Sequence, residues 1–146
     1  MSLRLRVAAA AAAIGACLPA HANEPAGLDL SAYRGQVVYL DFWASWCAPC
    51  LESFQWMTEM QNNYGRQGLG VIAVNVDHDH AAAERFLSNH FANFKVIYDP
   101  KGQIASKYKV AAMPTAYLIA RDGHVASSHN GFFENKEDAY ASQIAQ

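Results

Sequence analysis

Cysteine is scarce in this chain, which has three cysteines among 146 residues. Cys17 lies in an apolar segment near the N-terminus, so the sequence after that segment holds only Cys47 and Cys50. A disulfide framework for a small scaffold needs more cysteines at wider spacing, and a closed zinc site made of cysteine normally uses a second pair. The scarcity therefore argues against both uses, and the short spacing of the remaining pair calls for another explanation.

An excess of positive charge is also missing. The formal net charge is -2, with 11 Lys and Arg residues against 13 Asp and Glu residues. Proteins that bind nucleic acid usually present a basic face to the phosphates, so we expect no nucleic-acid partner. Hydrophobic residues make up 52% of the chain and charged residues 16%. This composition predicts a packed core rather than disorder, and the length fits one ordinary domain.

The first 22 residues have the composition of an export signal. Arg4 and Arg6 precede an apolar run over 7–18, and the segment closes on the small-x-small pattern of residues 20–22. A basic start, a short apolar stretch and such a site are typical of a signal peptide. The run is shorter than the roughly 20 residues that a membrane-spanning helix needs. We therefore predict a signal peptide over 1–22 and one domain over 23–146.

A second interpretation of the same segment stays open. Ile14-Gly15-Ala16-Cys17 resembles a bacterial lipoprotein signal, although Ile14 stands where that motif usually has leucine. In that case Cys17 would become the lipidated first residue and anchor the protein. Cleavage after Ala22 and lipidation at Cys17 both predict an exported, periplasmic protein. Such a compartment is oxidising, so a dithiol there closes readily to a disulfide.

Strands and helices alternate along the rest of the chain. Near-continuous apolar runs predict buried strands over 37–43 and 71–76, and apolar residues at helical spacing predict a helix over 51–64 between them. The other expected elements are a helix over 80–90 capped by Asp79, a short strand over 94–98, a short helix over 103–108, strands over 115–120 and 125–129 joined by an Asp-Gly turn, and a helix over 135–144. Alternation implies parallel pairs and the hairpin adds an antiparallel edge, so we predict an α/β domain of three α/β/α layers with a mixed central sheet.

The two cysteines lie where the first strand ends and its helix begins. A helix N-terminus offers unpaired amide hydrogens and a partial positive charge, both of which stabilise a thiolate. Lowering a thiol pKa from about 8.5 to about 7 makes about half of the thiol ionised at neutral pH. Cys47 is therefore the predicted nucleophile and Cys50, almost one turn further on, the resolving cysteine. Pro49 falls in the first turn, where its missing amide hydrogen is harmless, and stiffens the loop.

The segment "DFWASWCAPC" closely resembles the active-site segment of the thioredoxin superfamily. Together with "VIAVNVD", "MPTAYLI" and "RDGHV", it makes residues 33–144 similar to exported TlpA/ResA-type thiol-disulfide reductases. The resemblance implies a thioredoxin fold and a dithiol/disulfide cycle. It also implies a disulfide-bearing protein as substrate, for example in cytochrome c or oxidase assembly, and an upstream membrane thiol reductant. We predict a monomer that requires no organic cofactor.

Position by position, the resemblance assigns further residues to the site. Cys47 matches the exposed nucleophile, Cys50 the buried resolving cysteine, and Trp46 the tryptophan that flanks the site. Met113 and Pro114 match the loop whose proline is cis in this superfamily and faces the cysteines. A cis X-Pro bond makes a tight turn, and Pro114 has no amide hydrogen. We therefore expect the backbone of Met113 to be free to pair with an extended substrate strand.

Asp41 interrupts the apolar strand that leads to the cysteines, with Leu40 and Phe42 as neighbours. We expect it to be buried, and burial raises the pKa of a carboxyl group; the alternative is a solvated aspartate at a sheet edge. The resemblance implies a function, because thioredoxins proper carry a buried aspartate six residues before the nucleophile that helps deprotonate the resolving cysteine. This chain departs from thioredoxin at Ala73, where a lysine is usual.

Two other functions compete for the same cysteine pair. A copper(I) delivery protein could use Cys47 and Cys50 as thiolate ligands, but it would need a third soft or histidine ligand, and the sequence shows none at an obvious position. A thiol peroxidase is the other alternative. The acidic and histidine-rich run over 77–80 follows a strand and precedes a helix, so we interpret it as a loop and a cap and predict no metal site.

Overall fold

The computed structural model describes residues 28–145, which form a five-stranded sheet with the order β3-β2-β1-β4-β5. The strands are β1 (Val37–Trp43), β2 (Leu69–Asn75), β3 (Lys95–Tyr98), β4 (Thr115–Ile119) and β5 (Val125–Asn130). The pairs β1–β2 and β2–β3 are parallel, whereas β1–β4 and β4–β5 are antiparallel. The predicted mixed sheet, with a parallel half and an antiparallel hairpin at its edge, is confirmed.

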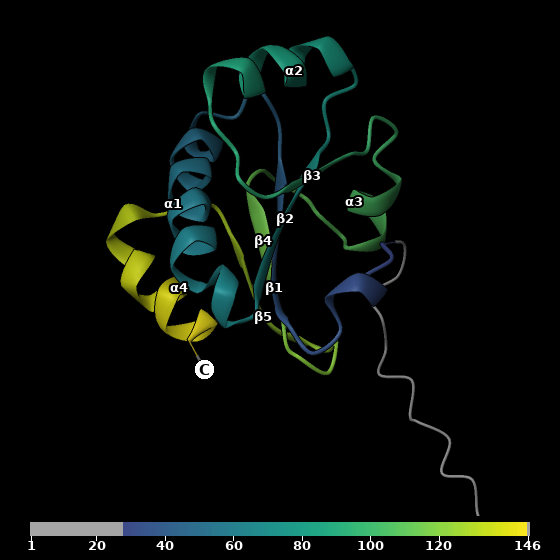
Figure 1. Cartoon of the computed structure of the whole chain (residues 1–146). Helices are drawn as coiled ribbons and strands as arrows, with labels where there is room; N and C mark the ends of the chain where they lie inside the picture. Colours follow the sequence, from purple (N-terminus) through teal and green to yellow (C-terminus); the bar gives the residue numbers. More distant parts are fainter. Residues whose placement is uncertain (1–27, 146) are drawn as a thin grey trace, which may run out of the picture.

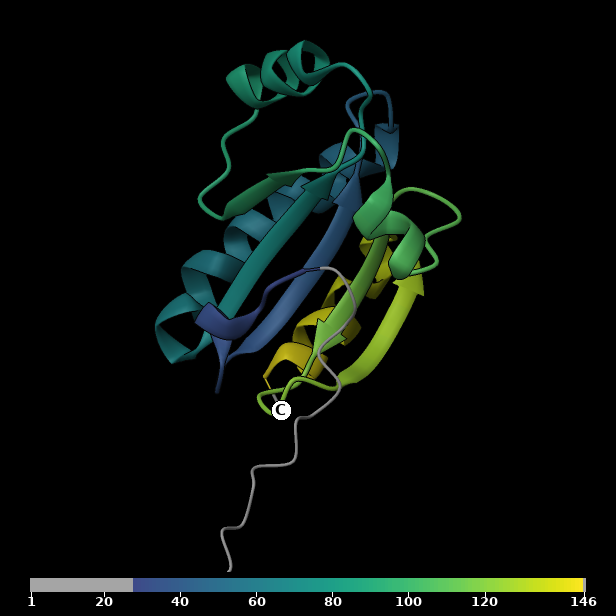
Figure 2. The ribbon, with the colours of Figure 1, turned by 90° about the vertical axis from the view of Figure 1, so that its right-hand side faces the viewer.

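Helices cover both faces of this sheet. They are α1 (Ala48–Tyr64), α2 (His80–Asn89), α3 (Gln103–Lys107) and α4 (Glu137–Ile144), with three short 3-10 turns, η1 (Ser31–Tyr33), η2 (Gly65–Gln67) and η3 (Glu134–Lys136). Figures 1 and 2 show α1 and α4 on one face, α3 on the other, and α2 at one end of the sheet. The three-layer α/β/α architecture is confirmed. Among residues 28–145, no helix is long and apolar enough to cross a membrane.

The side chains of β1 alternate between two buried clusters, because successive residues of a strand point to opposite faces. Val38, Leu40 and Phe42 belong to the α3-side cluster, which also contains Leu30, Ile72, Val74, Ala105, Tyr108 and Ile119. Tyr39 and Trp43 belong to the α1-side cluster, with Val37, Ala44, Cys47, Cys50, Phe54, Trp56, Met57, Met60, Leu69, Val71, Ala73, Ala83, Ala116, Leu118, Phe132, Tyr140 and Ile144. Burial on both faces explains why the sequence of β1 is an almost unbroken apolar run.

A cluster of aromatic rings packs α2 against the carboxyl end of β1. The ring of Trp43 lies 4.6 Å from that of Phe54 on α1 and 4.8 Å from that of Phe86 on α2. Phe54 also contacts Phe86 at 5.1 Å and Phe94 at 5.2 Å. Aromatic rings at these separations pack favourably when they meet edge to face. They hold α2 over the end of the sheet where β1 passes into α1. Asp79 caps α2 by accepting a hydrogen bond from the amide of Ala81 at 3.0 Å, as predicted.

Gly70 lies inside β2, which begins at Leu69, whereas the strand predicted from the sequence began at residue 71. A Cβ atom on Gly70 would lie 2.5 Å from Cδ1 and 2.6 Å from Cε1 of the Tyr33 ring. Tyr33 in η1 packs against the α3-side cluster, so the ring cannot simply swing away. The bare backbone of Gly70 is therefore what lets η1 lie against the sheet.

We predict that Gly70→Ala lowers the free energy of unfolding by about 1–3 kcal/mol, the usual effect of overpacking. Urea denaturation followed by circular dichroism measures it. A Tyr33→Ala background serves as the control, because without the ring the nearest remaining atom is Oε1 of Gln36 at 3.5 Å, an ordinary van der Waals contact. Equal effects of Gly70→Ala in the two backgrounds would contradict the packing explanation.

Candidate active site

The two cysteines occupy the start of α1, directly after the turn that follows β1. Cys47 is the N-cap residue of α1, with φ -91° and ψ 105°, and it forms a disulfide with Cys50, at a Cα–Cα distance of 5.3 Å. The amide of Cys47 donates to the carbonyl oxygen of Ala44 at 3.1 Å, and the amide of Cys50 donates to that of Cys47 at 3.2 Å. The predicted location of the pair at a helix N-terminus is confirmed.

Pro49 stands in the first turn of α1, as expected. A side chain at the N-cap position accepts a hydrogen bond from the amide of the second or third helical residue. The second helical residue is Pro49, which has no amide hydrogen, and the third is Cys50. The amide of Cys50, which in the disulfide state donates to the carbonyl oxygen of Cys47, is therefore the amide of this kind that lies nearest to a thiolate at Cys47. The helix dipole adds a partial positive charge at the same place.

The two sulfur-bearing residues differ in accessibility. Cys50 has no exposed surface, whereas Cys47 keeps 6% of its surface exposed. Cys47 is more exposed than Cys50, as expected, but it is much less exposed than the resemblance implied. The physical reason is that Cys47 packs within the α1-side cluster, and its sulfur is bonded to Cys50. In this disulfide state, an attacking thiolate has a narrow approach to Cys47 and none to Cys50.

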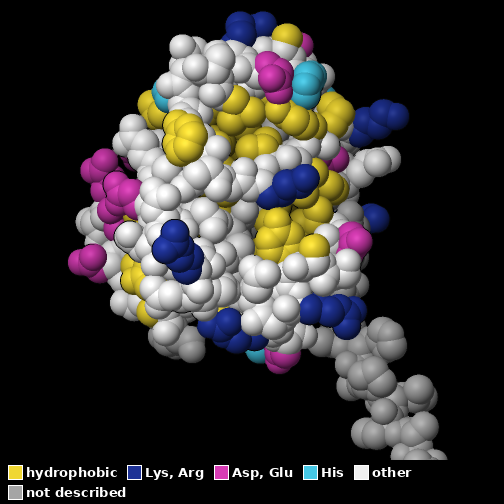
Figure 3. Space-filling model, viewed as in Figure 1, with side chains coloured by type: hydrophobic (Ala, Val, Ile, Leu, Met, Phe, Trp, Pro, Cys, Tyr) yellow, Lys and Arg dark blue, Asp and Glu magenta, His cyan; other side chains and the backbone are white. Residues whose placement is uncertain are grey.

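Trp46, next to Cys47, is largely exposed, at 73%. Large apolar side chains that stay in water beside a reactive group often mark a binding surface. Figure 3 shows that hydrophobic side chains also gather on one face of the molecule, over the part of the sheet below α2. The exposed indole of Trp46 therefore offers an apolar partner a contact next to the disulfide.

Asp41 is buried, with 1% of its surface exposed, so the alternative of a solvated edge aspartate is wrong. It lies in β1 opposite Ala73 of β2 and Ala116 of β4. Its position in the strand alternates with Leu40 and Phe42, so its side chain points to the face covered by α1. Among residues 28–145, the oxygen Oδ2 of Asp41 finds no hydrogen-bond partner. Burial raises the pKa of this carboxyl group well above its usual range.

The loop before β4 carries Met113 and Pro114, and the peptide bond between them is cis. Pro114 is buried, and its carbonyl oxygen accepts a hydrogen bond from the amide of Gly131 at 2.7 Å. Met113 is partly buried and packs against the cluster that contains both cysteines. Within the described part of the chain, the backbone of Met113 makes no hydrogen bond to another backbone group. Its amide and carbonyl are available for an extended peptide.

Asp77 lies close to the cysteine turn, which was not predicted from the sequence, where residues 77–80 were interpreted together as a loop and a cap. Asp77 is buried, with 5% of its surface exposed. Its carboxylate accepts hydrogen bonds from the amide and hydroxyl of Ser45, at 2.9 Å and 3.1 Å. The available signal was its position: it follows a strand predicted to lie parallel to the strand that leads to the cysteines, so both carboxyl ends meet at one edge.

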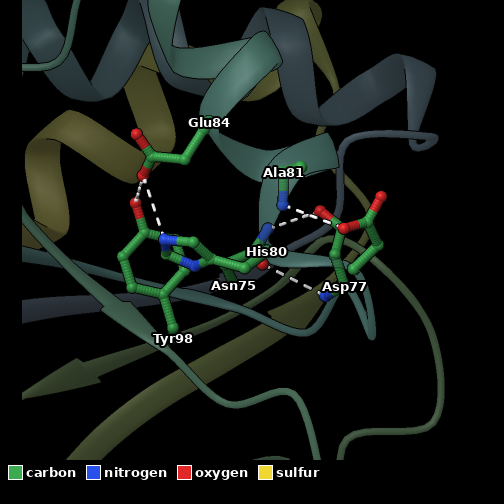
Figure 4. A network of polar contacts seen from close by, with 7 residues as sticks. Asn75, Asp77, His80, Ala81, Glu84 and Tyr98 are labelled. Carbon is green, nitrogen blue, oxygen red and sulfur yellow. Dashed lines mark hydrogen bonds and ion pairs between the residues drawn. The ribbon is translucent and has the colours of Figure 1, made fainter.

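The neighbouring histidines do not converge with it on a metal site. His78 bonds through Nδ1 to the carbonyl oxygen of Pro100 at 2.8 Å. His80 lies 3.6 Å from Glu84, which also accepts a hydrogen bond from Tyr98 (Figure 4). Over residues 28–145, no group of three or more His, Cys, Asp or Glu side chains is arranged to hold a metal ion. In this part of the chain, no His, Asp or Glu side chain therefore joins the cysteine pair in such a group.

Comparisons with known proteins agree with this arrangement. The family model described as Redoxin matches residues 7–144. The thiol-disulfide oxidoreductase ResA of Geobacillus kaustophilus is 36% identical over 109 residues, which are 75% of this chain and 62% of that protein. The ResA of Bacillus subtilis is 34% identical over 71% of this chain and 58% of its own length. The chain thus spans about three fifths of the length of these curated relatives.

Solved structures give the same result for the fold. A crystal structure of a candidate thiol:disulfide interchange protein DsbE from Chlorobium tepidum has a TM-score of 0.78 and 48% identity, covering 80% of this chain and 82% of that one. The exposed lipoprotein thioredoxin Etrx1 of Streptococcus pneumoniae has a TM-score of 0.70 and 31% identity, covering 80% and 88% of the two chains. The predicted thioredoxin fold is confirmed.

Proposed function

The chain belongs to the Redoxin family and is of the TlpA/ResA type within the thioredoxin superfamily, and from this premise we propose that it is a thiol-disulfide oxidoreductase acting on proteins. The observation that carries the proposal is the position of the disulfide. Cys47 caps the N-terminus of α1 and keeps a small exposed surface, while its partner Cys50 is fully buried. The sulfur of Cys47 can contact a substrate, whereas the sulfur of Cys50 can react only with Cys47.

The proposed reaction begins with the reduced protein. The thiolate of Cys47 attacks one sulfur of a partner's disulfide, forming a mixed disulfide and releasing the partner's second sulfur as a thiolate. Cys50 then loses its proton and attacks the sulfur of Cys47. The mixed disulfide breaks, the partner leaves as a dithiol, and the Cys47–Cys50 disulfide forms. The partner gains two electrons and this protein loses two, so no organic cofactor takes part.

Asp41 is the proposed acceptor of the Cys50 proton. Its carboxyl group lies on the sheet face covered by α1, and Cys50 is part of the same buried cluster. Burial raises the pKa of this carboxyl group well above its usual range. The carboxylate is therefore a stronger base than an ordinary aspartate, which favours proton transfer from the Cys50 thiol. Asp41 would accept the proton during resolution and release it when the disulfide is reduced again.

Trp46, Met113 and Pro114 form the proposed contact surface for the substrate. The exposed indole of Trp46 offers apolar contact beside Cys47. The free amide and carbonyl of Met113 offer backbone hydrogen bonds to an extended segment, as in strand addition at a sheet edge. Such a surface suits a protein substrate whose disulfide lies in an exposed, extended segment rather than in a packed core.

The finer assignments form part of the same proposal. The protein is exported, works as a monomer in the periplasm, and reduces partner disulfides, for example in cytochrome c or oxidase assembly. A membrane thiol reductant restores its dithiol. The predicted signal peptide over 1–22 and the lipidation alternative at Cys17 support export, and both lie outside the described residues. The direction of transfer depends on how well the structure stabilises the reduced thiolate.

The decisive experiment is a Cys50→Ser variant expressed in the native compartment. Without the resolving sulfur, the mixed disulfide between Cys47 and a substrate persists, and we expect a trapped partner on non-reducing gels that mass spectrometry identifies. The Cys47→Ser/Cys50→Ser double variant is the matched control and should trap nothing. If both variants yield the same bands, or if neither yields any, the proposed exchange is contradicted.

A further inference from the structure

Asp77 connects the end of β2 to the turn that carries the redox pair. Its oxygen Oδ2 accepts from the amide of Ser45 at 2.9 Å and from Nδ2 of Asn75 at 2.7 Å, and its Oδ1 accepts from the hydroxyl of Ser45 at 3.1 Å. The amide of Asp77 itself donates to Oδ1 of Asn75 at 3.1 Å. Figure 4 shows the side chains of Asn75 and Asp77 facing each other beside the start of α2.

This arrangement is well shielded from water. Asp77 is 5% exposed and Asn75 is 1% exposed. Hydrogen bonds to a carboxylate are stronger than those between neutral groups, and a buried carboxylate that loses its donors is costly. The amide of Val76 also donates to the carbonyl oxygen of Trp43 at 2.9 Å. Two adjacent links, one from Val76 and one from Asp77, thus bind the end of β2 to the segment 43–45.

Ser45 lies two residues before the nucleophile. The carbonyl oxygen of Ala44 accepts the amide hydrogen of Cys47 at 3.1 Å, so the turn at 44–47 is closed by a backbone bond. A shift of Ser45 therefore moves Cys47 relative to the amides at the start of α1. In the oxidised protein the bond to Cys50 also holds Cys47 in place. Reduction removes that bond, so the turn then depends more on its other links, among them the hydrogen bonds to the end of β2.

We infer that Asp77 is a positioning residue for the proposed thiol-disulfide exchange: through its hydrogen bonds to Ser45 it holds the sulfur of Cys47 against the N-terminus of α1 in the reduced protein. The inference rests on the proposed function but concerns a residue that touches neither sulfur. Asp77 acts on the reaction through Ser45. Its loss leaves the thiol in place and weakens the stabilisation of its ionised form.

The test compares Asp77→Ala with Asp77→Asn in the full reduced chain. Both variants remove the negative charge, but asparagine can still accept from the amide of Ser45 with its amide oxygen and donate to the Ser45 hydroxyl. The rate of Cys47 alkylation by iodoacetamide is measured from pH 5 to pH 10, in a Cys50→Ser background so that a single active-site thiol is followed. A control without Cys47 subtracts any reaction of Cys17.

At pH 7 we expect the alkylation rate of Cys47 to be at least about fivefold lower in Asp77→Ala than in Asp77→Asn. Both variants should reach the same plateau rate at high pH, because only the ionised fraction of Cys47 falls. A purely structural role would leave the two pH profiles superimposed, and superimposed profiles overturn the inference. Failure of the proposed function gives a different result. In that case Cys47 is alkylated no faster than a free thiol even in the protein that keeps Asp77.

Hydrogen exchange supplies a second measurement that needs no change at Asp77. The amide of Ser45 should be protected in the reduced protein as it is in the oxidised protein, because its acceptor is Asp77 in both. Rapid exchange of that amide in the reduced state would overturn the inference, even if Asp77→Ala does not fold.

Discussion

Cys47→Ser is expected to abolish the reduction of insulin disulfides, lowering the rate by about a thousandfold or more, to the rate measured without the protein. A serine hydroxyl does not ionise near neutral pH, so no nucleophile remains at the N-terminus of α1. Cys50 cannot replace it, because no part of its surface is exposed. The turbidity of the precipitating insulin B chain, followed with dithiothreitol as the electron source, measures the loss.

Cys50→Ser provides the comparison for this prediction. It keeps the nucleophile and should still form a mixed disulfide, but it should not release the reduced partner by itself. The two variants thus fail at different steps, one before and one after the covalent intermediate. The assigned roles would be reversed if Cys50→Ser reacted with no disulfide while Cys47→Ser still reduced insulin.

The architecture could be read from the sequence because β1 and β2 are buried on both faces. Such strands have nearly unbroken apolar runs, and α1 has a clear helical spacing of apolar residues. The beginning of β2 could not be placed in the same way. Gly70 looks like a residue that leads into a strand, and its place inside β2 is explained by the Tyr33 ring that packs on it. That contact joins residues far apart in the chain.

The site was predictable where its chemistry is local. The cysteine pair, Pro49 and the helix N-terminus follow one another in the sequence, so their relation could be inferred from spacing. The burial of Asp41 followed from its apolar neighbours in the strand. The hydrogen bonds from Ser45 to Asp77 span 32 positions of the chain, and only the parallel pairing of β1 with β2 brings them together. The low exposure of Cys47 likewise depends on packing with distant elements.

Asp41→Asn should change how stability depends on pH, and this is the second large effect that we expect. Burial raises the pKa of Asp41 in the folded protein well above that of an unfolded aspartate, which is about 3.9. Between these two values the folded state holds a proton that the unfolded state has lost. Stability contributed by the protonated form is therefore fully present below the unfolded pKa and is lost as the pH rises through the folded pKa.

The size of the effect follows from the same relation. Each pH unit between the two pKa values costs the native protein about 1.4 kcal/mol of unfolding free energy, whereas asparagine is neutral throughout. We expect Asp41→Asn to gain stability relative to the native sequence steadily as the pH rises from 4, in urea denaturation with the disulfide intact. Asp138→Asn, at an exposed position on α4, is the control for the loss of a carboxyl group that is not buried. If Asp41→Asn runs parallel to the native curve, burial does not raise the pKa of the Asp41 carboxyl group. An aspartate with an ordinary pKa is too weak a base for the role of accepting the Cys50 proton, and that role is then contradicted.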